Sequence, residues 1–559
     1  MSALTRRSWI LILTLALSVQ LGCLKAPPED TETDEGRKEV CEYWPEKLTV
    51  ASKVEKAFQM ITEAKCSSAL PKLEELFDKN VERARIIDAV RAIGDKDGAI
   101  GILRKGLKDG DVAPKAATIA ARWRLSELAN DLVVFTESSE DQRRAALDAL
   151  LAVSDAKNHE DLLITLTKTS PNVQDLKVND KALTALAKMG SKKGAPAIVT
   201  AAFMRSNHGQ HIYPAARRAL AKLPKEAVNS LIKVQAGTLT PVNVMAKEIG
   251  IPKWEIRGNQ ILPQLLADTL DRKAAVPAAK ILASPRTKPL NLSEKECTKN
   301  PRGHKCKQYQ TWNRYWINQH QYAHLAFGKL PPDDDAVDIL TKLVMSNGND
   351  FDTKMHRLFA ANALSYMGSP AAIKGLFKAW DEDPDWNRDK KDSQRRADFL
   401  AILTRPLLMA IGYQDLAELE KRWEKPERYV SMFEHVSKRV ALPNVKAMMA
   451  ALKECKLDGA CWIKLLDDSE RDVFIKAVFM LTRPFVNATD ARKALLARLK
   501  KTKDSDSDHR KFCLMGLARI GDKKTGEALI EMSKSPTVTK QNWKEQFTVL
   551  ANALIARNP

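Results

Sequence analysis

The feature that most constrains this chain is a short apolar pattern that ends in glycine and recurs along the sequence. In four copies the glycine follows Ile or Met, and apolar or small residues stand four and eight positions before it. Residues at these spacings share one face of a helix, and glycine accepts the left-handed conformation that often ends a helix. Because apolar residues return eight and nine positions later, the pattern predicts a helix, a stop and a second helix. The four glycines are Gly94, Gly190, Gly368 and Gly521.

Weaker copies keep the same apolar spacing around other positions. In the first part of the chain successive copies lie 30 to 36 residues apart, and later ones lie 37 and 44 residues apart. Helical hairpins that recur at such intervals stack on their neighbours and bury a continuous core. We therefore predict an all-α fold. The weaker copies are centred on Arg124, Ser154, Pro224, Pro331 and Gly412.

This pattern resembles the HEAT-repeat family in its short form, and the likeness spans roughly residues 50–559. The resemblance implies a right-handed α-solenoid of HEAT-like antiparallel helix pairs over residues 41–559, with insertions near 284–311 and 383–396. It also implies a scaffold or adaptor, because such repeats offer long binding surfaces rather than a reaction pocket. An irregular helical protein with chance periodicity is the alternative.

The first residues read as an export signal that does not belong to the fold. Arg6 and Arg7 precede an apolar run, residues 9–19, that is too short to span a membrane comfortably. The following segment, 21–23, resembles the end of a bacterial lipoprotein signal. The resemblance implies that residues 1–22 are a lipoprotein signal peptide and that Cys23 is lipidated. An ordinary secretory peptide is the alternative, since Gln stands where lipoprotein signals prefer Leu.

The residues after Cys23 predict where the mature chain is held. Leu24 stands where Asp would signal retention in the inner membrane, so the resemblance implies an outer-membrane anchor that faces the periplasm rather than the cell surface. Residues 23–40 are rich in acidic side chains and contain Pro27 and Pro28, a composition that predicts a disordered acidic tether. No later stretch of the sequence is long and apolar enough to span a bilayer.

The eight cysteines also indicate export. Apart from Cys23 and Cys513 they form three pairs that are close in sequence, as expected for disulfides in an oxidising compartment. The repeat pattern places Cys513 in the core and predicts a buried, inert thiol. A metal site on Cys297, His304 and Cys306 is the alternative for one pair, but it lacks a fourth ligand at a usual spacing. The candidate pairs are Cys41 with Cys66, Cys297 with Cys306, and Cys455 with Cys461.

The body of the protein is strongly basic. The formal charge is +20, or +18 without Arg6 and Arg7, and because residues 24–39 contribute −3, residues 40–559 carry +21. Such a body should attract anionic surfaces and acidic partners. Export argues against nucleic acid and favours lipid head groups, cell-wall polymer or acidic envelope proteins. The alternative is that the charges only keep the surface solvated.

Two aromatic segments are candidate partner contacts. In the first, two Trp and two His residues recur at four-residue steps and should form one stripe on a helix. In the second, two Trp residues flank an acidic loop. Tryptophan is common in binding hot spots, while packing between repeats is the alternative for both segments. The histidines have the spacing of zinc ligands, but the Glu of the metalloprotease motif is absent. The candidates are Trp312, Trp316, His320 and His324, and then Trp380 and Trp386.

No sequence motif indicates catalysis. The sequence has no Gly-rich phosphate loop, no Ser nucleophile elbow and no Cys–His pair in a recognisable setting. We therefore expect a protein that is not an enzyme and needs no cofactor or metal. The leading hypothesis is a non-catalytic envelope scaffold that binds envelope proteins, acidic ones among them, and contacts the membrane through its N-terminal lipid. The alternative is a binder of peptidoglycan or lipopolysaccharide that uses a basic, Trp-bearing surface.

Overall fold

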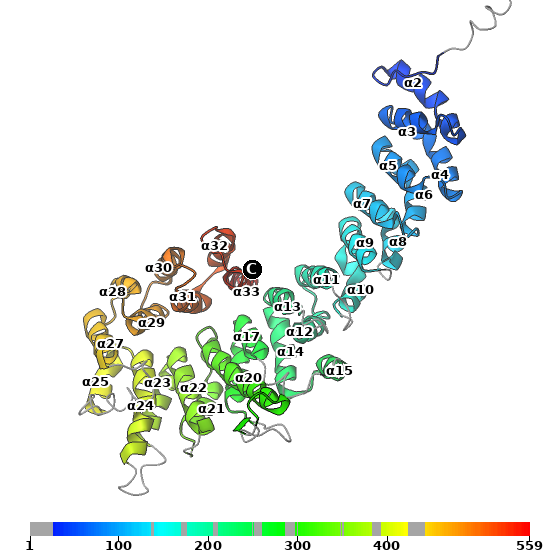
Figure 1. Cartoon of the computed structure of the whole chain (residues 1–559). Coiled ribbons are helices and arrows are strands. Elements are labelled where there is room, and N and C mark those ends of the chain that lie inside the picture. Colours follow the sequence, from blue (N-terminus) through cyan, green and yellow to red (C-terminus); the bar gives the residue numbers. More distant parts are fainter. Residues whose placement is uncertain are drawn as a thin grey trace, which may run out of the picture. The chain divides into compact units, whose positions relative to one another are not determined.

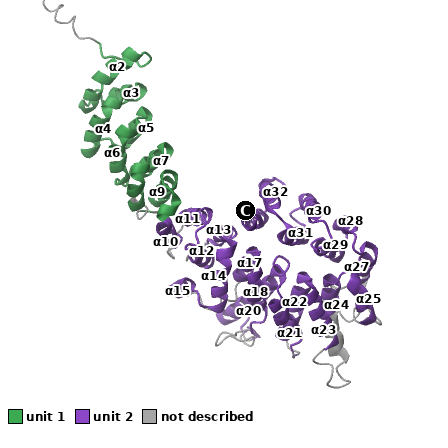
Figure 2. Ribbon diagram, turned by 180° about the vertical axis from the view of Figure 1, so that it is seen from behind, with its two compact units in different colours: residues 1–159 green, residues 160–559 purple. Residues whose placement is uncertain are grey.

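The computed structural model describes the chain except for residues 1–25, 136–138, 169–175, 205–210, 249, 251–259, 286–296, 299, 347, 349–350, 383–392, 423–441 and 559. The described residues form helices and the turns that join them, which confirms the prediction of an all-α fold. They divide into two compact units, residues 1–159 and residues 160–559 (Figure 2). The predicted signal peptide and Cys23 lie outside the described residues.

In unit 1 the helices after α2 alternate between two layers (Figure 1). Helices α3, α5, α7 and α9 pack side by side in one layer, and α4, α6 and α8 pack in the other. Apolar residues of both layers are buried between them, as the repeat pattern requires. The helices are α2 (Asp34–Tyr43), η1 (Pro45–Thr49), α3 (Val54–Glu63), η2 (Ser67–Ala69), α4 (Leu70–Asp78), α5 (Arg83–Ile93), α6 (Lys96–Leu107), α7 (Ala113–Trp123), η3 (Ser126–Leu128), α8 (Ala129–Phe135), α9 (Glu140–Val153) and η4 (Ala156–His159).

The junction at Gly94 shows how the sequence pattern ends one helix and starts the next. Gly94 has φ +80°, and its N–H donates to the carbonyl of Val90 at 3.2 Å, which ends α5. Asp95 then accepts from the N–H of Gly98 at 3.1 Å and caps the start of α6. Positive φ values at Gly190 and Gly368 place the same conformation at two more predicted stops.

Gly521 differs from the prediction. It has φ −66° and ψ 150°, an extended conformation that any residue adopts. A Cβ added here would lie 2.8 Å from Cδ1 of Leu554 and would also collide with the carbonyl of Leu517. Glycine is needed at this junction because α31 (Ser507–Ile520) and α33 (Gln541–Arg557) approach closely, and not because of a left-handed stop.

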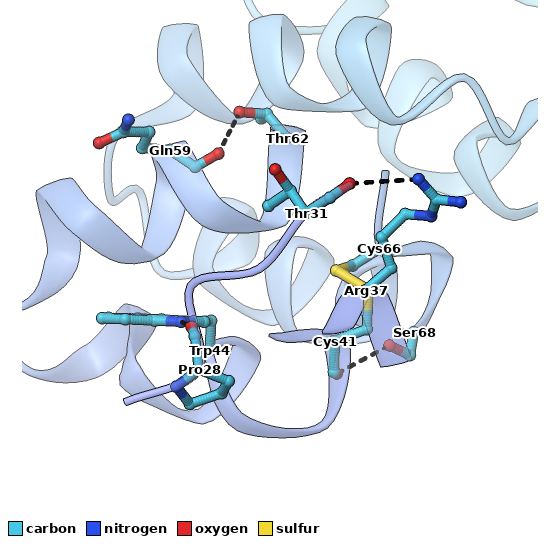
Figure 3. Close-up of a disulfide and its surroundings, with 9 residues drawn as sticks. All are labelled: Pro28, Thr31, Arg37, Cys41, Trp44, Gln59, Thr62, Cys66 and Ser68. Carbon is cyan, nitrogen blue, oxygen red and sulfur yellow. Dashed lines mark hydrogen bonds between the residues drawn. A yellow bond between two sulfur atoms is a disulfide. The ribbon is translucent and has the colours of Figure 1, made fainter. Parts of the chain in front are cut away.

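The predicted boundary between tether and fold also needs correction. Helix α2 already begins at Asp34, with Thr33 as its N-cap, although residues up to 40 were expected to be disordered. Val40 and Trp44 are buried, and the indole of Trp44 donates to the carbonyl of Pro28 at 2.6 Å (Figure 3). Composition missed this helix because two buried apolar side chains and one cap are enough to dock a short, mostly polar segment.

Unit 2 also has two layers, but its last helix packs against its early helices. Helices α20, α22 and α24 are successive neighbours in one layer and α18, α21 and α23 in the other, while α33 contacts α13, α14 and α17 (Figure 1). The helices are α10 (Glu160–Leu166), α11 (Lys177–Lys188), α12 (Ala195–Phe203), α13 (Tyr213–Leu220), α14 (Pro224–Ala236), α15 (Thr240–Glu248), α17 (Ile261–Asp268), η5 (Arg272–Ala274), α18 (Ala275–Leu282), α20 (His304–Ala326), α21 (Asp334–Val344), α22 (Phe351–Met367), α23 (Pro370–Asp381), α24 (Ser393–Ala410), α25 (Tyr413–Arg422), α27 (Leu442–Cys455), α28 (Gly459–Lys464), η7 (Leu465–Asp467), α29 (Arg471–Met480), α30 (Ala488–Lys501), α31, α32 (Lys523–Lys534) and α33.

Several helix junctions in the described residues escaped the sequence pattern, and three of them are closely alike. At each of these three a residue other than glycine adopts positive φ, between +48° and +53°. An apolar residue stands four positions before each one, so the pattern was present and only the glycine was missing. At a junction that was predicted, Arg124 likewise takes the place of glycine in the left-handed conformation, with φ +58°. The three junctions are Lys65 after Ile61, Leu270 after Leu266, and Lys456 after Leu452.

Candidate interaction surfaces

The first aromatic segment forms one stripe along α20, and this stripe is buried. Trp312, Trp316, His320 and His324 are between 0% and 9% exposed. The Trp316 ring lies 5.3 Å from that of His356 on α22, and rings of the same helix stack on His324. This arrangement favours packing between repeats over direct contact with a partner.

Both histidines of the stripe are bonded to the carbonyl four residues earlier on α20. Nδ1 of His320 lies 2.9 Å from the carbonyl of Trp316, and Nδ1 of His324 lies 3.3 Å from the carbonyl of His320. Because a carbonyl only accepts, the proton must sit on Nδ1 in both rings. Burial lowers the pKa of His324 to about 3. Within the described residues, no group of three His, Cys, Asp or Glu side chains is arranged to hold a metal ion.

The second aromatic segment is described only in part. Trp380 lies near the end of α23 and is 4% exposed, so it also packs inside the protein. Trp386 lies outside the described residues, as does most of the insertion predicted near 383–396, while α24 begins at Ser393. The other predicted insertion, near 284–311, includes the first two turns of α20.

The structure contains the three disulfides that were proposed from sequence spacing. Each joins residues whose Cα atoms are 4.6 to 5.2 Å apart: Cys41 with Cys66, Cys297 with Cys306, and Cys455 with Cys461. In Figure 3 the first of these ties α2 to the start of η2, where Ser68 also donates to the carbonyl of Cys41 at 3.1 Å. The pairing of Cys297 with Cys306 leaves no thiolate for the alternative metal site. Cys513 is free and buried, and burial raises the pKa of its thiol to about 12.

Salt bridges join successive repeats of unit 1. The partners lie 27 to 30 residues apart, so each bridge connects equivalent helices of neighbouring repeats. All of them are at least partly exposed to solvent, and their side chains follow the surface of the two layers. The bridges are Glu55–Arg85 (2.6 Å), Asp78–Lys105 (2.7 Å), Asp88–Lys115 (2.9 Å) and Arg104–Asp131 (3.0 Å).

A shallow hollow of about 580 Å³ lies between α3 and α5 on this surface. Phe58 and Ala89 form its buried floor, and the guanidinium of Arg85 lies 4.6 Å from the centre of the Phe58 ring. Charged residues of both signs surround it. The hollow suits one side chain of a bound protein rather than an enclosed substrate, because it is open to solvent.

A buried charge cluster holds α33 against the early helices of unit 2. Nε of Arg217 donates to Asp268 at 2.6 Å, and Nζ of Lys329 donates to the other oxygen of that carboxylate at 2.9 Å. Glu545 on α33 lies 3.7 Å from Arg217. Burial alone would raise the pKa of Asp268, but Arg217 and Lys329 hold it below its ordinary value. The cluster balances two cations with two carboxylates, as a buried ionic group requires.

Cations that are buried or half-buried also satisfy the carboxyl ends of helices in unit 2. The guanidinium of Arg519 on α31 donates to the carbonyls of Phe327 and Gly328, at 2.7 and 3.0 Å, where α20 ends. It also donates to carbonyls at the end of α22. Lys476 and Arg483 donate in the same way to carbonyls at the end of α24. These carbonyls lack partners within their own helices. The cations therefore join α29 and α31 to the ends of α20, α22 and α24.

The charge of the body is distributed unevenly, which the sequence analysis missed. Residues 40–159 carry a net charge of −1, and residues 160–559 carry +22. Counting charges repeat by repeat would have revealed it. Among the helices that the structure describes, none is long and apolar enough to cross a membrane.

Comparison with known proteins finds no matching family model and no matching curated protein. Among solved structures, the crystal structure of She4p is 12% identical over 99% of this chain and 95% of that chain, with a TM-score of 0.19. At this TM-score the likeness carries no argument about fold or function.

Proposed function

We propose that the protein is a non-catalytic scaffold of the bacterial cell envelope, built as a right-handed α-solenoid of HEAT-like helix pairs. In this proposal residues 1–22 are a signal peptide and a lipid on Cys23 anchors the protein at the outer membrane, facing the periplasm. One or more envelope proteins bind along its helices.

The observation that carries this proposal is the ordered packing of successive helix pairs within each unit. Such packing buries the apolar residues in the core. The polar side chains of each repeat then form a row on the surface, where they can contact other molecules. The three disulfides support an oxidising compartment, because structural disulfides are rare where thiols are kept reduced. The charge of +22 on residues 160–559 favours an acidic partner.

A second candidate is a binder of peptidoglycan or lipopolysaccharide, which the same basic charge favours. Two sequence features favoured this candidate, the basic charge and the tryptophans that were predicted to lie on the surface. Trp312, Trp316 and Trp380 are buried and Trp386 lies outside the described residues, so within the described part of the chain only the cations support this candidate.

The test is crosslinking of the full-length protein in intact cells, followed by identification of its neighbours. We expect one or a few envelope proteins to be crosslinked repeatedly, whereas recovery of none would contradict the scaffold. A Cys23→Ser variant provides the control for the anchor. It should leave the membrane fraction, and unchanged membrane association would contradict lipidation.

A further inference from the structure

A stretch of unit 2 around the first half of α20 is rich in cations and free of acidic side chains. Residues 297–332 contain six Lys and Arg residues and no Asp or Glu. Four of these cations, Arg302, Lys305, Lys307 and Arg314, are exposed, and we call them the α20 basic face. In the part of the chain that the structure describes, none of the four forms an ion pair.

Two residues of the α20 basic face, Lys307 and Arg314, lie on the side of α20 opposite the buried stripe, while Arg302 and Lys305 stand at its amino-terminal end. Lys307 and Arg314 are seven residues apart, so they share one side of the helix and stand about 10 Å from each other along its axis. Exposed Gln310 and Gln321 lie on the same side. The side is therefore polar along its length, with cations near its amino-terminal end.

The helix that carries this face is firmly held. Trp312 and Trp316 are buried on its other side, and the disulfide between Cys297 and Cys306 closes the segment in front of it. A charged surface that is already fixed loses less side-chain and backbone freedom when a partner binds. This arrangement contrasts with unit 1, where cations at the surface, the half-buried Arg85 and the exposed Lys115, already have carboxylate partners.

We propose that the α20 basic face binds an acidic segment of a protein partner, an inference that rests on the scaffold function proposed above. The guanidinium group of arginine and the ammonium group of lysine are opposite in charge to carboxylates and donate hydrogen bonds to them. The glutamine amides add donors and acceptors that suit a peptide backbone.

An anionic membrane fits this face less well. Helices that lie in a membrane surface bury an aromatic or aliphatic side in the lipid, and the aromatic side of α20 is occupied inside the protein. Within the described residues of 297–332, no large apolar side chain is exposed that could insert.

The test compares two variants of the full chain with equal net charge. In the first, Arg302, Lys305, Lys307 and Arg314 are all replaced by Gln. In the matched control, Lys225, Lys233, Lys493 and Lys500, exposed on α14 and α30, are replaced by Gln. The probes are a labelled decaglutamate peptide and vesicles of phosphatidylglycerol, each at low and at moderate salt, and circular dichroism checks that both variants fold.

We expect the first variant to bind the peptide about tenfold more weakly than the wild type and the control to change less than about twofold. Equal losses in both variants, or no binding of the peptide by the wild type at low salt, would overturn the proposal. Loss of vesicle binding with unchanged peptide binding would overturn it as well, in favour of a membrane contact. The crosslinking experiment distinguishes failure of this inference from failure of the scaffold proposal. If the wild type and the first variant are crosslinked equally to the same envelope proteins, the inference about the α20 basic face is wrong and the scaffold proposal stands.

Discussion

Unit 1 and unit 2 stack similar helix pairs but place their charges differently. In unit 1 the charges nearly cancel, and its salt bridges run along the surface between repeats that are neighbours in the sequence. In unit 2 a large excess of positive charge remains, and two of its ion pairs, Arg217–Asp268 and Arg405–Asp472, are buried between helices that are more than 50 residues apart in the sequence. Exposed pairs add little to stability, whereas losing one partner of a buried pair leaves an uncompensated charge. The same repeat pattern therefore yields two units that should respond very differently to mutation.

The largest effect is expected at the buried cluster of unit 2. An Asp268→Asn substitution leaves Arg217 and Lys329 without their shared carboxylate and should lower the free energy of unfolding by about 3–5 kcal/mol. The measurement is urea unfolding followed by circular dichroism. The matched control is Asp88→Asn, which removes an exposed partner of Lys115 in unit 1 and should change the midpoint little. Similar losses from both would contradict the difference between the units.

The disulfide of unit 1 should come next. Cys41 and Cys66 are 25 residues apart, and closing a loop of this length stabilises a fold by about 3 kcal/mol. A Cys41→Ser, Cys66→Ser double variant should unfold at correspondingly lower urea concentration under oxidising conditions. Replacing Cys455 and Cys461, which close a loop of 6, should cost less. A larger loss of stability from replacing Cys455 and Cys461 would show that loop length does not determine how much each disulfide stabilises the fold.

A smaller effect should appear as a pH dependence in unit 2. Burial lowers the pKa of His324 from 6.5 to about 3, so on acidification the unfolded chain takes up this proton before the folded protein does. Stability is therefore lost as the pH falls from 6.5 towards 3. The difference in unfolding free energy between the wild type and His324→Leu should shrink by about 2 kcal/mol from pH 7 to pH 5. Parallel pH curves for the two proteins would contradict this.

The smallest effect is expected at the surface of unit 1. A Glu55→Gln substitution removes the pair with Arg85, and because that carboxylate is exposed we expect no measurable shift of the urea midpoint. The hydrogen bond to Arg85 lowers the pKa of Glu55, and this shift should be visible by NMR titration of the wild type. A clear destabilisation would show that the exposed bridges act as a network and would weaken the contrast with unit 2.

The sequence by itself determined the local structure of this protein. Apolar spacing gave the all-α class and many helix ends, such as the stop at Gly94, because one turn of helix is decided by residues three and four apart. The disulfide pairs could be proposed because their partners are at most 25 residues apart. The short helix α2 was missed, since its docking depends on buried contacts that composition does not report.

Tertiary structure decided everything that joins distant repeats. Asn552 on α33 donates to the carbonyl of Arg218, a contact 334 residues apart, and Arg519 reaches carbonyls of α20 that are 191 and 192 residues away. Contacts between helices nearer in the sequence, which local patterns also do not report, decide the need for glycine at position 521, the burial of the Trp312 and Trp316 stripe, and the surroundings of Asp268. The distant contacts follow from the sum of many small rotations between successive helix pairs, and no short stretch of sequence specifies that sum.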